Sequence, residues 1–198
     1  MQEGPILRAA FIAAALTLGL SQLGHPTSAR REPARLVADD IAPDPLLTKL
    51  ATYRKWKLVN PTPQLMEPLA AISCARIVGR SEGSPHLHKY ISVYVSDEGS
   101  GAMLQQLKPA FPVGSIIVKE KLAEKTSTEP ELLTVMLKRE PGYNEAGGNW
   151  EYLVLDGKGT KIEQRGKLAS CNSCHIEYKH SDYVTRTYLS NEVRNGLK

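Results

Sequence analysis

Apolar residues recur at helical spacing in the first part of the chain after residue 45. They are Leu46, Leu47, Leu50, Tyr53 and Trp56. Residues three and four positions apart lie on the same side of a helix, so this pattern predicts an amphipathic helix. A second helical piece is predicted over residues 64–75, broken or kinked at Pro68 because proline cannot continue the helical hydrogen bonds.

The middle of the chain changes from helical to strand periodicity. β-Branched and aromatic residues predict strands over residues 89–96, 113–124 and 132–140, and residues 150–166 read as two strands joined through Asp156 and Gly157. A short helix is expected over residues 98–108, ending before Pro109, and residues 141–149 form a turn cluster. Strands that follow one another at hairpin distance favour an antiparallel sheet.

The pattern as a whole predicts an α+β fold. Helices come first, a mainly antiparallel sheet with flanking helices follows, and a short helical tail carries two cysteines. Residues 182–198 are expected to form a terminal helix. No internal repeat interrupts this order, so residues 46–198 are predicted to be one domain.

The first residues follow another pattern. An apolar run extends from Ala9 to Leu23 behind Arg8, and small residues stand at positions 27–29. The run is short for a membrane span, so residues 1–29 are predicted to be a secretory signal peptide, with an uncleaved anchor as the alternative. Residues 30–45 hold prolines and charges without a period and are predicted to be a linker. We therefore expect a periplasmic or otherwise exported protein.

The charge balance changes this picture little. The chain has 25 Lys and Arg against 21 Asp and Glu, a formal net charge of +4. The basic residues are spread among nearly as many acids, which argues against nucleic acid as a partner.

The strongest chemical signal is the stretch Cys171-Asn172-Ser173-Cys174-His175. It matches the C-x-x-C-H pattern of covalent haem attachment. Cysteines three apart lie on one face of a helical turn, where both thiols can add to the vinyl groups of one porphyrin. The neighbouring His175 can then bind the iron through an imidazole nitrogen. The motif predicts one covalent haem c per chain.

A redox dithiol, a plain disulfide and a zinc site fit the motif less well. A thioredoxin-like dithiol belongs in a βαβ setting, and a disulfide leaves the histidine unexplained. A structural zinc site needs four ligands, for which Cys74, His86 or His88 would have to join the motif. The odd cysteine, Cys74, is expected to be a small buried hydrophobe.

The sixth iron position decides the kind of cytochrome. No methionine follows Met136, which argues against a methionine ligand from a downstream loop. His180 is too near His175 in the chain to reach the other haem face. His86 and His88 are the remaining candidates, although both read as solvated residues of a loop before a strand. We therefore expect a five-coordinate iron or one that holds water.

Several further stretches resemble the cytochrome P-460 family and the related cytochromes c′-beta. In chain order they are "VYVS", "FPVGSIIVKEKL", "VMLKREPGYN", "GNWEYLVLD" and "CNSCHIEYKHSDYV". The resemblance spans roughly residues 52–189. It implies an antiparallel fold, a homodimer, and one c-type haem that packs against the sheet with an open distal side. It also implies hydroxylamine oxidation with nitric oxide as intermediate or ligand, or gas binding in the c′-beta members.

The resemblance assigns a special role to Lys119. In the P-460 members a lysine of the "VKE" strand bonds covalently to the porphyrin edge, and this position is Lys119 here. Alternation places Ile117, Lys119 and Lys121 on one strand face and Glu120 on the other. Spacing alone would make both lysines solvated, so Lys119 is a candidate cross-link that rests on the resemblance.

One departure from the family bears on activity. The cross-linked enzyme has an arginine two residues before its "VYV"-like strand, and this chain has Ile91. The face of Lys89, Ile91, Val93 and Val95 is then nearly aliphatic, which suits uncharged diatomic ligands better than a proton-coupled oxidation. Glu140 and Glu151 have no assigned place. Trp150 and Tyr152 are expected in the core. Asp182 and Tyr183 match the family's tail and could steady a haem propionate or the helix, and the structural role is favoured.

Two functions follow from these residues. The first is a haem protein that binds nitric oxide or oxidises a small nitrogen compound such as hydroxylamine, a possible haem oxidoreductase served by a redox partner protein. The alternative is an electron-transfer cytochrome with a sixth protein ligand.

Overall fold

The computed structural model describes residues 44–66 and 88–198. The predicted signal peptide, Cys74, His86 and most of the second predicted helix lie outside the described residues. Among the residues that are described, no helix has the length and apolar character needed to cross a membrane.

The N-terminal helix is shorter than its apolar spacing predicts. Helix α1 covers Pro45–Leu50, with Asp44 accepting a hydrogen bond from the Leu46 amide at its start, and a 3-10 turn, η1, covers Tyr53–Lys55. Short strands β1 (Lys57–Leu58) and β2 (Gln64–Leu65) follow. The prediction of helix at Gln64 and Leu65 is therefore wrong.

Pairing with a neighbouring strand explains this difference. Both β1 and β2 pair antiparallel with β3 (Tyr90–Val95), and the Met66 amide donates to the Lys89 carbonyl. A short isolated helix is marginal in water, whereas the edge of β3 offers backbone partners that local spacing does not reveal.

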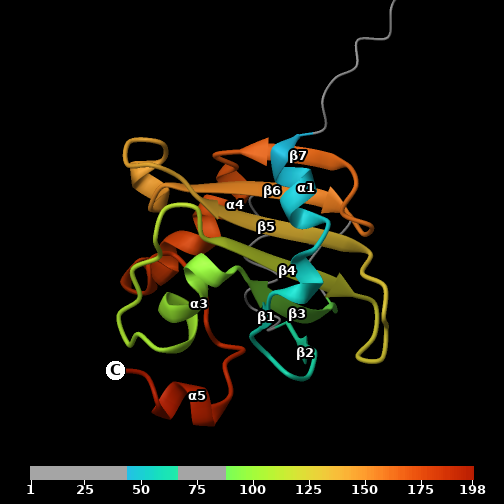
Figure 1. The fold of residues 1–198 in the computed structure, drawn as a ribbon, viewed down its shortest axis with the longest axis horizontal. Coiled ribbons are helices and arrows are strands. Elements are labelled where there is room, and N and C mark those ends of the chain that lie inside the picture. Colours follow the sequence, from blue (N-terminus) through green and yellow to red (C-terminus); the bar gives the residue numbers. More distant parts are fainter. Residues whose placement is uncertain (1–43, 67–87) are drawn as a thin grey trace, which may run out of the picture. The chain divides into compact units, whose positions relative to one another are not determined.

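The central sheet confirms the predicted antiparallel arrangement. After β3 come β4 (Ile116–Leu122), β5 (Leu132–Lys138), β6 (Trp150–Asp156) and β7 (Ile162–Gly166). The strand order is β1-β3-β4-β5-β6-β7, with β2 also on β3, and all pairs are antiparallel (Figure 1). The fold class is α+β.

Helices lie between and after the strands. Helix α3 (Asp97–Leu104) confirms the predicted short helix, and the turn cluster contains the 3-10 helix η2 (Glu145–Gly147). Helix α4 (Ala169–His175) carries the two cysteines and leads into η3 (Ile176–Ser181), and α5 (Asn191–Asn195) ends the described elements. The predicted long terminal helix is wrong over residues 182–190, where Asp182 and Tyr183 have left-handed backbone angles instead.

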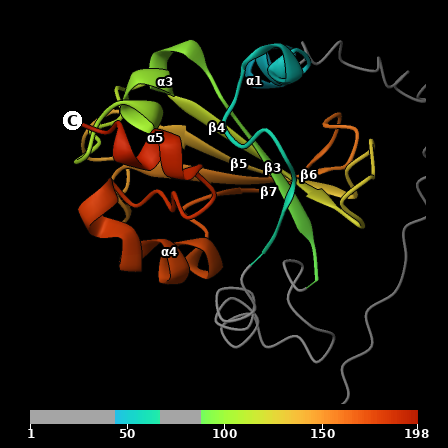
Figure 2. The same ribbon diagram turned by 90° about the horizontal axis from the view of Figure 1, so that it is seen from below.

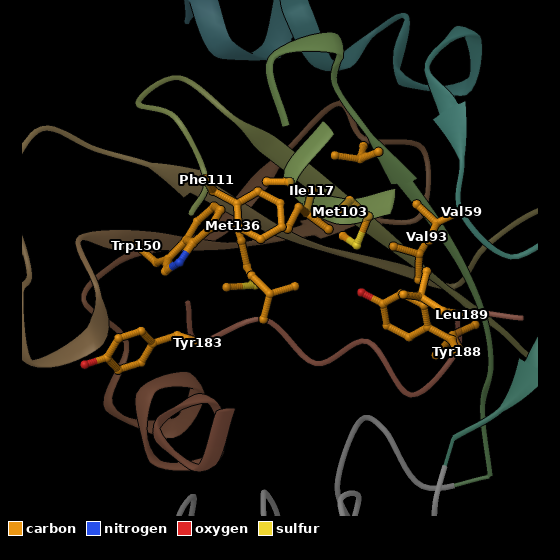
Figure 3. Close-up of a cluster of buried hydrophobic side chains, with 14 of the residues drawn as sticks. Val59, Val93, Met103, Phe111, Ile117, Met136, Trp150, Tyr183, Tyr188 and Leu189 are labelled. Atoms are coloured by element: carbon orange, nitrogen blue, oxygen red, sulfur yellow. The ribbon is translucent and has the colours of Figure 1, made fainter. Parts of the chain in front are cut away.

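The two faces of the sheet are covered by different parts of the chain. Helix α1 lies on one face and α4 on the other (Figure 2). On the α1 side the core comprises Leu46, Leu50, Tyr53, Ile116, Val118, Leu133, Val135, Leu153 and Leu155. On the α4 side, Phe111, Trp150, Met136, Ile117, Val93 and Tyr188 belong to one cluster (Figure 3). Burial of apolar residues on both faces explains why the central strands are almost continuously apolar.

Candidate functional site

A cavity of about 340 Å³ lies on the α4 side of the sheet. Its lining combines strand residues with both motif cysteines and the motif histidine. Those on which its chemistry depends are Ile91, Lys119, Lys121, Tyr152, Cys171, Cys174 and His175. The sequence-predicted site residues, Lys119 and the motif residues, are thus brought to one place.

Helix α4 presents both thiols to this cavity. Cys171 and Cys174 are one turn apart, and neither is in a disulfide. The Leu168 carbonyl accepts hydrogen bonds from the amides of Cys171 and Asn172, so the first turn is closed. Burial raises the pKa of Cys171 to about 11, which keeps this residue in the thiol form at neutral pH.

The ring of His175 is held by a single backbone group. Its Nδ1 lies 2.6 Å from the Tyr183 carbonyl oxygen. A carbonyl only accepts, so Nδ1 carries the proton and Nε2 keeps the lone pair that a metal needs. Burial, helped by the charges of Lys119 and Lys121, lowers the pKa of His175 to about 4, so the ring is neutral at physiological pH.

Both lysines of β4 face the cavity, together with Ile117. The expectation from spacing that they are solvated is wrong: Lys121 is only 1% exposed, and Lys119 is half-buried with its ammonium 5.5 Å from the centre of the Tyr188 ring. The sheet has a covered face on this side, which strand alternation cannot reveal.

Of the acidic residues that the sequence analysis named, Glu120 lies where alternation placed it, and Glu140 and Glu151 lie outside the cavity lining. Glu120 is on the opposite face, where Tyr53 Oη and Arg54 Nε donate to its carboxylate at 2.7 and 2.8 Å. Glu151 is paired with Arg139 and Arg165, and Glu140 is exposed. Glu163, which no sequence pattern singled out, is an acidic residue that lines the cavity, and it is exposed.

The strand face of Lys89, Ile91, Val93 and Val95 differs in part from the aliphatic wall that was predicted. Ile91 lines the cavity, but Val93 and Val95 are buried in the hydrophobic cluster. Lys89 is paired with Glu131. His88, one of the predicted sixth ligands, is exposed and is not among the cavity-lining residues.

Two methionines that sequence reasoning did not consider line the cavity. Met66 has its sulfur 3.8 Å from the Lys121 ammonium, and Met136 comes from β5. The sequence analysis considered a methionine ligand only downstream of the motif and found none there, whereas β2 brings Met66 in from upstream. No local signal indicated this, because residues 64 and 65 were predicted to be helical.

Among the described residues, one hydroxyl group in the cavity lining has no hydrogen-bond partner. Tyr152 is 2% exposed, and its Oη is the buried side-chain polar atom that lacks a partner within the described parts of the chain. Its ring lies 5.4 Å from that of His175. A buried donor without an acceptor is costly, so a bound group that supplies an acceptor would complete the site. Trp150 and Tyr152 are core aromatics, as predicted.

The donor set fits a haem better than a zinc ion. One helix offers two thiols at the spacing of haem attachment and one neutral imidazole, beside a mainly apolar cavity. Within residues 44–66 and 88–198, no three His, Cys, Asp or Glu side chains are gathered in a way that could hold a metal ion. A tetrahedral zinc site would need four such ligands.

Comparison with known families agrees with this site. The model of the family described as cytochrome P460 matches residues 51–186, which include Lys119, Cys171, Cys174 and His175. The chain belongs to the cytochrome P460 family, as the resemblance of its motifs predicts. It is therefore a haem protein of the cytochrome class, with a small-molecule ligand at its haem. No curated protein matches the chain closely enough to be compared.

Proposed function

We propose that the chain is an exported mono-haem c-type cytochrome with an open distal site, which binds nitric oxide or oxidises a small nitrogen compound such as hydroxylamine. The observation that carries the proposal is the convergence of Cys171, Cys174 and His175 on one cavity. When bound, a haem supplies an iron that exchanges single electrons and binds small ligands.

Different residues of the chain have different roles at this site. Cys171 and Cys174 would tether the cofactor from α4, and His175 would present Nε2 to the iron while the Tyr183 carbonyl holds its Nδ1 proton. Tyr152 offers a hydroxyl donor from within the cavity. Lys119, on the β4 face that lines the cavity, is the candidate for a further bond to the porphyrin edge.

The other wall supports a small, weakly polar ligand. Ile91, Ile117 and Met136 contribute apolar surface, while Gln64 and Thr134 are neutral polar lining residues. These residues offer no group that could exchange a proton at neutral pH, and their apolar surface suits an uncharged diatomic ligand, although Lys119, Lys121 and Glu163 belong to the same lining. Nitric oxide is accordingly the ligand that we favour. Export, a redox partner protein and a homodimer complete the proposal.

Covalent attachment is tested by replacing both cysteines. The wild-type protein, produced in a host that attaches c-type haem, should have the mass of the mature polypeptide plus one haem. Cys171→Ala with Cys174→Ala should lose that added mass completely, because no thioether can form. Ser173→Ala, within the same helix, is the matched control and should keep it. A wild-type mass equal to that of the bare polypeptide would refute the proposal.

A cross-link at Lys119 is tested by peptide mapping. After proteolysis, the haem-bearing peptide of residues 171–175 should carry a second peptide that contains Lys119. Lys119→Arg should release this second peptide, whereas Lys121→Arg should not. Detection of the haem peptide alone from the wild type would rule out the cross-link and leave a c′-beta-like gas-binding site.

The second candidate function is electron transfer, and Met66 is the observation that favours it. Its thioether sulfur lines the cavity and could supply a sixth ligand. The reduced wild-type protein should show a high-spin visible spectrum that shifts with carbon monoxide if the site is open. A sharp low-spin spectrum that ignores carbon monoxide, and becomes high-spin in Met66→Ala, would establish the electron carrier instead.

A further inference from the structure

A strained corner follows helix α4 and η3. Asp182 has φ of 48° and Tyr183 has φ of 64°, so two successive non-glycine residues adopt the left-handed conformation. Each such residue is strained and persists only where the surroundings hold it. Strain of this kind is common where a backbone group has a defined task.

An ion pair from the sheet holds this corner in place. Lys138 Nζ, at the end of β5, lies 2.7 and 2.8 Å from the two carboxylate oxygens of Asp182 and also donates to the Gly148 carbonyl at 2.9 Å. The two side chains are only 13% and 16% exposed. Charge-assisted hydrogen bonds in such a location are less screened than surface pairs.

Two further hydrogen bonds attach the same residue to the core. The Phe111 amide donates to Asp182 Oδ2 at 2.9 Å, and Trp150 Nε1 donates to the Asp182 carbonyl at 2.8 Å. The Lys138 ammonium lies 5.0 Å from the centre of the Trp150 ring, which adds a cation–π contact. Asp182 is therefore bound through its backbone and both carboxylate oxygens.

Tyr183, the residue after Asp182, contacts the motif histidine directly. The carbonyl of Tyr183 is the group that lies 2.6 Å from His175 Nδ1, and the Tyr183 amide donates to the Tyr178 carbonyl at 2.8 Å. A carbonyl that follows a pinned residue has little freedom to move away from the imidazole. The ion pair thus acts on His175 through one intervening peptide group.

We propose that Asp182 and Lys138 are positioning residues that strengthen the hydrogen bond from His175 Nδ1 to the Tyr183 carbonyl and thereby tune the histidine as an axial haem ligand. This inference rests on the proposed function. A strong bond at Nδ1 makes the ring a better electron donor at Nε2, which favours the oxidised state of a bound metal. Weakening it should lower the iron–histidine stretching frequency and raise the reduction potential.

The test uses substitutions that separate charge from backbone shape. Asp182→Asn removes the charge but keeps a residue that tolerates the left-handed conformation. Lys138→Met removes the other partner, and Lys138→Arg restores a cation. Arg139→Gln is the matched control, because Arg139 is the adjacent residue and its ion pair with Glu151 does not involve the corner.

The measurements are resonance Raman spectra of the reduced holoprotein and redox titrations. Asp182→Asn and Lys138→Met should both show a lower iron–histidine frequency and a higher potential, Lys138→Arg should return both toward wild type, and Arg139→Gln should leave them unchanged. Circular dichroism and haem content check that each variant folds. If well-folded Asp182→Asn and Lys138→Met keep both values of the wild type, the inference is overturned and the corner is only structural.

Different measurements distinguish failure of the proposed function from failure of this inference. A wild-type protein that carries no haem contradicts the proposed function, while the imidazole bond can still be observed by nitrogen NMR of the histidine rings. An upfield shift of the His175 Nδ1–H proton in Asp182→Asn, which reports a weaker hydrogen bond, would then support the positioning role. A proton shift equal to that of the wild type would overturn it.

Discussion

At the scale of single residues, Gly148 decides how closely the corner can approach the turn before β6. Its φ is 65°, and a Cβ built on it would lie 2.3 Å from a carbon of the Tyr183 ring. Its carbonyl also accepts the hydrogen bond from Lys138. Because Gly148 has no side chain, the Tyr183 ring can pack against it while the Tyr183 carbonyl contacts His175.

Gly148→Ala should destabilise the protein by about 2 kcal/mol or more. Part of the cost is the left-handed conformation, and the rest is displacement of the Tyr183 ring. Gly142→Ala is the control: its φ is 89°, but no atom lies within 4 Å of the added Cβ, so only the conformational cost of about 1 kcal/mol applies. Urea unfolding of the two holoproteins measures the difference, and equal midpoints would contradict this account.

At the scale of elements, strand β4 serves both faces of the sheet. Ile117, Lys119 and Lys121 point into the cavity, while Glu120 on the other side receives the hydrogen bonds of Tyr53 and Arg54. The segment η1 is thereby anchored on the strand that carries the candidate cross-link. Burial and the nearby Glu120 carboxylate raise the pKa of Tyr53 above its usual value, so its hydroxyl remains a donor.

Tyr53→Phe should cost about 1–2 kcal/mol of stability. The substitution removes a donor to a buried carboxylate but leaves Arg54 in place and preserves the ring. Tyr94→Phe, which alters the neighbouring ring that packs edge-on at 5.3 Å, should cost less and is the control. The visible spectrum should not change in either variant, because both act on the face away from the cavity. A spectral change in Tyr53→Phe would show that the two faces are coupled.

At the scale of the molecule, the two hydrophobic cores differ in how completely side chains fill them. The core on the α1 side is closed by apolar side chains, whereas the core on the α4 side surrounds a cavity of about 340 Å³. A ligand that binds the native state but not the unfolded state stabilises the native state. The effect is largest where the ligand fills a cavity whose lining would otherwise lack contacts.

Removal of the cofactor should therefore lower the stability of the α4 side of the sheet more than that of the α1 side. The Cys171→Ala, Cys174→Ala double variant should melt roughly 5 °C or more below the holoprotein, which corresponds to about 2 kcal/mol for a chain of this length. Hydrogen exchange should accelerate in α4 and in residues 182–190, but not in the strand interiors next to α1. Uniform acceleration would indicate that the cofactor supports the whole fold equally.

How much the sequence could predict depends on whether the signal is local. The strands from β3 to β7 and helix α3 were predictable, because alternation and turn residues act over a few positions. The strand at Gln64 and Leu65 was not, because pairing with β3 overrode the local preference. The tail at residues 182–190 was missed because ion pairing with Lys138 and hydrogen bonds to distant residues stabilise a conformation that its own sequence disfavours.

The sequence by itself determined the attachment motif, since two cysteines and a histidine within one helical turn share a face whatever surrounds them. Only the tertiary structure decided that Lys119 and Lys121 face a cavity, that Met66 reaches it, and that Asp182 and Lys138 support the carbonyl bound to His175. These relations join residues far apart in the chain. They depend on which face of the sheet is covered and by what, and no local pattern carries that information.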